Sequence, residues 1–167
     1  MSFRKLLPCI MLLSLATPLL AQNRGTAEAT VKGKKISINY GRPSLKGRDM
    51  LSQATPGTVW RVGMNLATEI ETAGDLKVGS TVVKAGKYSL WAKKTGEDTW
   101  VLAFHPKTGV WGKPELKEGY IAELPLKMEK ANDSAEQLTI ALAENNGKGW
   151  IKIHWGTAQL NGAFDVN

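Results

Sequence analysis

Short runs of alternating apolar and polar residues, separated by turn residues, are the feature that most constrains how this chain can fold. From Ala27 onward, apolar residues recur at every second position, as in Ile36, Ile38 and Tyr40, and no segment holds them at helical spacing over three turns. An alternation of period two places one face of a strand in the core and the other toward solvent. The pattern therefore predicts an all-β chain.

Further rows of this kind follow along the sequence. They are Thr68, Ile70 and Thr72; Tyr88, Leu90 and Ala92; Trp100, Leu102 and Phe104; Ala122, Leu124, Leu126 and Met128; Leu138, Ile140 and Leu142; and Ile151, Ile153 and Trp155. Gly79-Ser80, Ala85-Gly86 and Asn145-Asn146-Gly147 suit tight turns between antiparallel strands. We expect a single antiparallel β-sandwich or jelly-roll-like domain of about nine or ten short strands. Pro125 favours an edge strand for its row, because proline cannot donate to a ladder.

The first residues have the features of a secretory signal peptide. Arg4 and Lys5 precede an apolar run over residues 6–20, and the small residue Ala21 marks the expected cleavage site. We therefore expect a signal peptide over residues 1–21, a single domain over residues 22–167, and a periplasmic or extracellular location. The apolar run is shorter than the ~20 residues of a membrane span. Cys9 leaves with the leader, so the mature chain has no cysteine and must be stabilised by packing alone.

The charge pattern argues against nucleic-acid binding. The chain has 22 Lys and Arg against 15 Asp and Glu, and loss of Arg4 and Lys5 leaves 20 against 15, a net charge of +5. These cations are interspersed with acids rather than clustered.

His105 and His154 are the only histidines and have no His or Cys neighbour, so the sequence predicts neither a metal site nor a cofactor.

Planar arginine side chains and tryptophans are the residues that suit a binding site. The planar guanidinium group of arginine forms bidentate hydrogen bonds with carboxylates and phosphates, and indole rings stack on sugars or aromatic groups. The candidate ligand-binding residues are Arg42, Arg48, Trp60, Arg61, Asn65 and Trp111, of which Trp60, Arg61 and Asn65 share the segment from Val59 to Thr68. The alternation also places Trp91 on the outward face, available for stacking, whereas Trp60, Trp100 and Trp155 are better assigned to the core. Alternatively, Arg42 and Arg61 pin loops to carbonyl groups or to Glu69 and Glu71.

Three functions remain open on these residues. The leading one is a non-enzymatic binding domain of the cell envelope, for a glycan, a small anionic ligand or a protein partner. The second is a hydrolase of envelope polymers whose carboxylates, from among Glu69, Glu71, Asp75 and Glu123, meet only in the fold. The third is a purely structural envelope module. The mature chain has no Cys nucleophile and no G-x-S-x-G motif, so no catalytic residue is predicted.

Several motifs, in order, resemble a known family. They are Tyr40-x-Arg42-Pro43-Ser44-x-Lys46-Gly47-Arg48, Val59-Trp60-Arg61-x-Gly63-x-Asn65-x-Ala67-Thr68, Ala85-Gly86-Lys87-Tyr88-Ser89-Leu90, Trp111-Gly112 and Glu136-Gln137-Leu138-Thr139-Ile140. Together they resemble the DUF2911 family, exported bacterial proteins of unknown function. The resemblance implies a compact exported β domain and assigns no reaction. Members often read Ala-Asn-Glu-Ala-Thr where this chain reads Met64-Asn65-Leu66-Ala67-Thr68, so the acid of that motif is absent here.

Overall fold

The computed structural model describes residues 23–111 and 119–167, and the predicted signal peptide lies outside these residues. The described chain forms ten strands and no helix, which confirms the all-β prediction. The strands are β1 (Arg24–Val31), β2 (Lys34–Gly41), β3 (Val59–Trp60), β4 (Thr68–Thr72), β5 (Leu76–Val78), β6 (Thr81–Val83), β7 (Gly86–Lys94), β8 (Thr99–His105), β9 (Ala122–Asn145) and β10 (Lys148–Val166).

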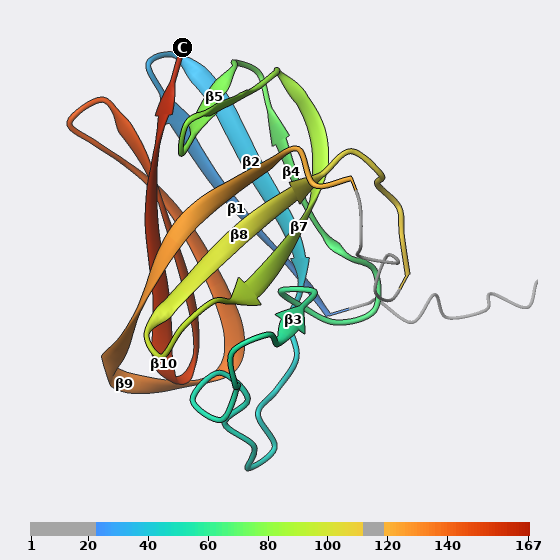
Figure 1. Cartoon of the computed structure of the whole chain (residues 1–167), viewed down its shortest axis with the longest axis vertical. Coiled ribbons are helices and arrows are strands. Elements are labelled where there is room, and N and C mark those ends of the chain that lie inside the picture. Colours follow the sequence, from blue (N-terminus) through green and yellow to red (C-terminus); the bar gives the residue numbers. More distant parts are fainter. Residues whose placement is uncertain (1–22, 112–118) are drawn as a thin grey trace, which may run out of the picture.

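All ten strands belong to one antiparallel sheet. Its order is β1-β2-β4-β7-β8-β9-β10-β5-β6, and the two-residue strand β3 pairs with β7. Figure 1 shows how this sheet curls, with β1 and β2 behind the interior and β8 and β9 in front of it. The antiparallel arrangement was expected, but two separate sheets, as in a sandwich or jelly roll, are not shown.

The strands β9 and β10 are much longer than the sequence suggests. Two predicted apolar rows and the polar stretch between them form the single 24-residue strand β9, and β10 has 19 residues. The ribbon they make changes register on both sides of Gly156, which has a φ of 67° and pairs with Ala135. Such bulges let a long strand bend sharply, so one ribbon can follow a curved sheet. The bend brings the Phe164 ring against Gly149 on the same strand.

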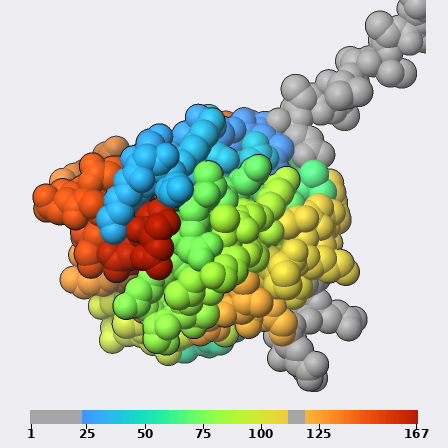
Figure 2. Space-filling model, turned by 90° about the horizontal axis from the view of Figure 1, so that it is seen from above, coloured from blue at the N-terminus to red at the C-terminus, as the bar shows by residue number. Residues whose placement is uncertain are grey.

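Contacts between distant parts of the chain hold the curled sheet together at both ends. After β2, the chain meets β9, where the Leu45 amide donates to the Glu136 carbonyl (2.8 Å) and the Leu138 amide to the Pro43 carbonyl (3.0 Å). At the opposite end, Lys32 Nζ donates to the Val166 carbonyl at 3.0 Å. Figure 2 looks down on that end and shows the N-terminal strands in blue beside the C-terminal strand in red.

The core fills the inner face of the sheet. The predicted apolar rows supply most of it, and Ile36, Ile38, Leu90, Leu102, Leu138 and Ile153 are buried. A second, smaller apolar cluster lies outside this core. Its buried members are Ala67, Trp91 and Ala103, with Val110 and Tyr120 packed against them. Part of the sheet is therefore covered on both faces.

The position of Pro125 corrects one prediction. Strand β9 is not an edge strand, because it lies between β8 and β10. Pro125 pairs with Val101 on β8, while the pairing of β9 with β10 begins only at Lys127. Proline is thus accommodated at the end of a ladder rather than at the edge of the sheet.

Candidate functional site

The connection between β3 and β4 is a strained bend. Val62 and Asn65 have φ angles of 53° and 60°, in the left-handed region that residues with a side chain rarely adopt. Asparagine tolerates this conformation, but a β-branched valine does not. Such conformations cost about 1–3 kcal/mol each and persist only where the surrounding structure enforces them. The bend is therefore a place where packing overrides local preference.

Several side chains enforce this conformation. Arg61 Nη1 donates to the Asn65 carbonyl at 3.0 Å, across the turn, and the buried Thr68 Oγ1 donates to the Val62 carbonyl at 2.6 Å. Gly41 packs against the same turn, and a Cβ there would collide with the Met64 carbonyl. Val62 itself is fully buried in the main core. These contacts fix the direction in which the bend presents its outer atoms.

Arg24, at the start of β1, braces the outer side of the bend. Its Nη1 and Nη2 donate to the carbonyls of Leu66 (3.4 Å) and Ala67 (3.5 Å), and its Nε donates to Asn39 Oδ1 at 2.5 Å. Partial burial lowers the pKa of Arg24, and the nearby Glu69 opposes that shift. Arg24 was not predicted as a site residue, because nothing in its sequence neighbours distinguishes it from the other cations of the chain.

Trp111 adjoins this bend with its side chain in solvent. Its backbone forms an antiparallel bridge with Leu66, and the Ala67 amide donates to the Val110 carbonyl at 3.0 Å. The side chain of Trp111 is nevertheless 64% exposed, more than any other large apolar residue among those described. The structure therefore places the Trp111 backbone next to the bend that holds the Arg61–Asn65 hydrogen bond.

The other predicted site residues lie elsewhere or serve the scaffold. Arg42 Nε donates to the Leu138 carbonyl at 3.3 Å, which ties the end of β2 to β9. Arg48 is exposed on the loop between β2 and β3. Trp60 is half-buried and stacks on Trp155, as expected of a core residue. The predicted group of three arginines is thus divided, and the carbonyl contacts of Arg42 and Arg61 agree with the loop-pinning alternative.

Three of the four acids considered for hydrolysis each pair with a different lysine, and the fourth, Glu71, is exposed on β4. Glu69 pairs with Lys87 (2.8 Å), Asp75 with Lys84 (2.9 Å) and Glu123 with Lys93 (2.5 Å). Glu69 also accepts a hydrogen bond from the Gly109 amide at 2.6 Å. Its partial burial acts to raise its pKa, but the bonds from Lys87 and Gly109 outweigh this effect and hold the pKa below the usual value. A low pKa keeps a carboxylate charged and unsuited to act as a general acid.

The histidines are engaged with their own neighbours. His105 Nδ1 accepts a hydrogen bond from the Lys107 amide at 3.0 Å, and His154 Nε2 lies 3.1 Å from the Gly156 carbonyl. Within residues 23–111 and 119–167, no three His, Cys, Asp or Glu side chains come together as metal ligands would. The same residues include no helix long and apolar enough to cross a membrane.

Trp91 is a correction to the sequence analysis. It was expected on the outward face and available for stacking, but it is completely buried. Its Nε1 donates to Ser89 Oγ at 3.0 Å, and Ser89 Oγ donates to the Lys107 carbonyl at 2.8 Å. Alternation assigned its face correctly but could not reveal that the segment after β8 covers that face.

These features define a small all-β protein with a braced bend beside an exposed indole. Residues 22–164 match the family described as protein of unknown function (DUF2911), so the chain belongs to this family. The predicted family is thereby confirmed over residues 22–164. Neither the curated proteins nor the solved structures include a match.

Proposed function

We propose that this protein is an exported, non-enzymatic binding domain of the cell envelope, and that it binds an acidic glycan at the bend between β3 and β4. Its export rests on the signal peptide predicted over residues 1–21. Its scaffold is a jelly-roll-like variant in which the bent ribbon of β9 and β10 takes the place of strands that change sheets. The ligand-binding residues are Trp111, Arg61 and Asn65.

The exposure of Trp111 is the observation that carries this proposal. An indole that is 64% exposed contributes little to stability, because most of its apolar surface remains in water after folding. Its backbone is nonetheless held to Leu66, next to Asn65 in the bend. An aromatic ring on a fixed backbone can stack on the apolar face of a sugar with little loss of conformational entropy.

The charge beside Trp111 favours an acidic sugar. The bond from Arg61 Nη1 to the Asn65 carbonyl occupies one N–H of the guanidinium and holds its plane in place. A guanidinium has five N–H donors in a rigid fork, and this fork matches the geometry of a carboxylate. Arg24 adds a second positive charge at the same bend. A uronic acid or a sialic-type sugar would stack on the Trp111 indole and pair its carboxylate with the guanidinium groups.

Binding is supported better than hydrolysis. Retaining and inverting glycosidases use two cooperating carboxyl groups, one of them with a raised pKa. Here Glu69 and Asp75 each pair with a lysine, and those contacts hold the pKa of each below the usual value. These two carboxylates therefore act as ion-pair partners.

A glycan screen of the mature protein tests the proposal. Acidic and neutral oligosaccharides of the envelope are compared by thermal shift, since a ligand that binds only the native state raises the melting temperature. We expect acidic sugars to bind and Trp111→Ala to weaken that binding by roughly tenfold or more, the effect of losing one stacking contact. Trp150→Ala is the matched control, because Trp150 is also exposed (41%) but lies on β10.

The same experiment separates binding from a purely structural role. If Arg61 serves only the bend, Arg61→Lys lowers the melting temperature and no sugar in the screen binds the wild-type protein. If Trp111→Ala and Trp150→Ala weaken binding equally, the ligand does not lie at the bend. Either result would contradict the proposal.

A further inference from the structure

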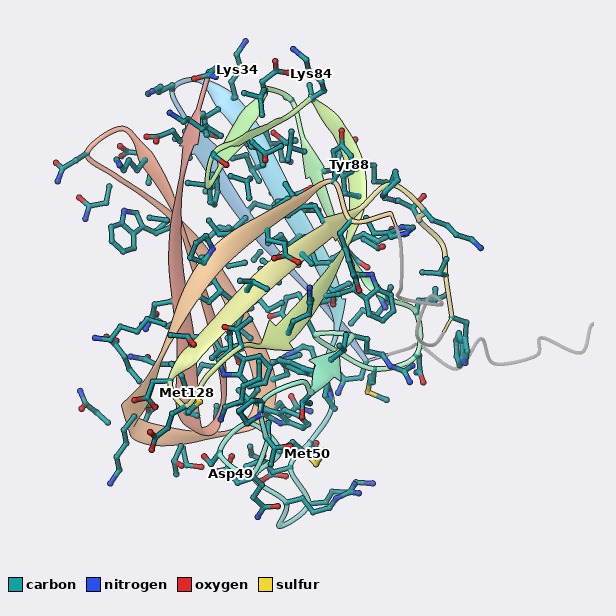
Figure 3. The ribbon with its side chains drawn as sticks, viewed as in Figure 1. Lys34, Asp49, Met50, Lys84, Tyr88 and Met128 are labelled. Carbon is teal, nitrogen blue, oxygen red and sulfur yellow. The ribbon has the colours of Figure 1, made fainter. Side chains whose placement is uncertain are left out.

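A small, partly open cavity lies under the loop that joins β2 to β3, at the end of the curled sheet where β3 lies. Its volume is about 110 Å³, and it is lined mainly by Met50, Leu51, Ala54, Thr58, Trp60 and Trp100. Figure 3 shows Asp49 and Met50 on this loop, beneath β3. Met50 is 51% exposed and forms part of the outer wall. A mouth of this kind is a common place for small-molecule sites in curled β-sheets.

The loop is anchored on both sides, so the cavity is preformed. Asp49 accepts hydrogen bonds from Thr157 Oγ1 (2.9 Å) and from the Ser52 amide (3.3 Å). The Gly57 amide donates to the Lys94 carbonyl and the Lys94 amide to the Thr58 carbonyl, both at 2.9 Å. A preformed site does not require the loop to be ordered when a ligand binds.

Two buried indole N–H groups at this end have no acceptor among the described residues. They belong to Trp100, which is 1% exposed and lines the cavity, and to Trp155, which is 6% exposed and stacks on the lining residue Trp60. Leaving a buried donor without an acceptor costs about 1–3 kcal/mol. A fully desolvated donor of this type in a native protein needs an explanation, and a bound acceptor is one.

A buried positive charge lies next to the cavity, beside two of its lining residues, Ala54 and Trp100. Lys94 is 6% exposed, its Nζ donates to the Ala54 carbonyl at 2.9 Å, and it lies 5.8 Å from the centre of the Trp100 ring. An ammonium group has three N–H donors, and a buried charge normally has a counter-charge. In the part of the chain that the structure describes, no carboxylate lies within ion-pair distance of Lys94. The missing counter-ion is thus the second feature that points to a ligand.

We propose that this cavity binds a small monocarboxylate with an apolar body, such as an aromatic or branched short-chain acid. The carboxylate accepts hydrogen bonds from Lys94 and from an indole N–H, and the apolar body lies against Trp60, Leu51 and Met50. At about 110 Å³ the cavity is smaller than the cavity of about 150 Å³ that holds a benzene ring, so an aromatic ring extends past the exposed Met50 side chain into the opening. This site differs from the one at Trp111 and does not depend on the proposed glycan binding.

Benzoate and benzamide are matched probes for this site, because they share a shape and differ in charge. Titration of the mature protein is followed by tryptophan fluorescence and by the NMR signals of the indole N–H groups. We expect benzoate to bind saturably, to shift the signals of Trp100 and Trp155, and to bind at least roughly tenfold more tightly than benzamide, the effect of one charge-assisted hydrogen bond. Trp111→Ala should leave benzoate binding unchanged.

Two substitutions locate the ligand. Ala54→Leu fills the cavity and should abolish benzoate binding, whereas Ala141→Leu, on the exposed side of β9, should not. Lys94→Met removes the charge and should make benzoate bind no better than benzamide. Three results would overturn the proposal: no binding of either probe at millimolar concentration, equal binding of both by the wild-type protein, or benzoate binding that survives Ala54→Leu. None of the three requires the Lys94 variant to fold.

Discussion

The indole of Trp60 stacks on the indole of Trp155, with ring centroids 5.7 Å apart and planes inclined by 11°. Trp60 belongs to the two-residue strand β3, and Trp155 lies next to the bulge of β10 at Gly156. Their contact therefore links the short strand that precedes the braced bend to the point where the longest ribbon of the fold turns. Both proposed sites lie beside this link, one on each side of β3 along the chain.

Loss of this stack should destabilise the fold. We expect Trp60→Ala to lower the free energy of unfolding by about 2–4 kcal/mol, because it removes an aromatic pair and leaves a cavity beside Trp155. Trp150→Ala, which truncates an exposed indole, should change it by no more than about 1 kcal/mol. Urea unfolding of the two variants provides the comparison, and equal effects would show that the stack contributes nothing beyond ordinary surface packing.

Arg61 should be more sensitive to a conservative change than Arg48. Arg61→Lys loses the directed bond to the Asn65 carbonyl and should lower the free energy of unfolding by about 1 to 3 kcal/mol, the range for hydrogen bonds to charged groups. Arg48→Lys is the control, because that side chain is exposed, and its effect should stay within about 0.5 kcal/mol. Thermal and urea unfolding measure both. An Arg61→Lys variant as stable as wild type would mean that the bend does not need this bond.

The backbone conformation of Asn65 predicts opposite effects for two small residues. At its φ of 60°, alanine is disfavoured by about 1 to 2 kcal/mol, whereas glycine adopts this conformation without steric cost. We expect Asn65→Ala to destabilise the protein by about 1 kcal/mol and Asn65→Gly to remain within about 0.5 kcal/mol of wild type. Asn132→Ala, at an exposed position of β9, should have little effect. Asn65→Ala and Asn65→Gly variants of equal stability would contradict the conformational argument.

Glu69 should make stability depend on pH in the acidic range. Its folded-state pKa lies below the usual value, so the folded protein binds its proton less readily than the unfolded chain does. The stabilising contribution is therefore complete above the ordinary carboxylate pKa and is lost as pH falls through the lowered value. Glu69→Gln should flatten the acid limb of the melting temperature against pH, whereas Glu71→Gln, on the exposed side of the same strand, should not.

The exported protein should begin at or near Gln22. Ala21 is the small residue at the end of the apolar run, and no comparable cleavage context follows between Arg24 and Ala27. Intact-mass measurement of the secreted or periplasmic material gives the starting residue directly. A retained leader, or a first residue beyond Ala27, would show that the signal peptide was assigned wrongly.

The sequence by itself determined the class of the fold, its inner face and most of its turns. Rows such as Ile36, Ile38 and Tyr40 are buried as their alternation requires, because side chains of a strand point to its two faces in turn. Asn146-Gly147, with positive φ at both residues, forms the turn between β9 and β10. The family could also be predicted, since its motifs are local in sequence. These features need no knowledge of distant partners.

Only the tertiary structure decided where the strands bend and which parts of the sheet are covered on both faces. The polar stretch inside β9 remains extended because β10 runs beside it, and the bulge at Gly156 folds both strands around the core. Trp91 is buried because a distant segment packs over the outer face of β7. Likewise, Lys94 meets Ala54 and Arg24 meets Leu66 across long stretches of chain. The alternation of apolar and polar residues describes one strand at a time. Each of these contacts depends instead on the free energy of packing the whole sheet.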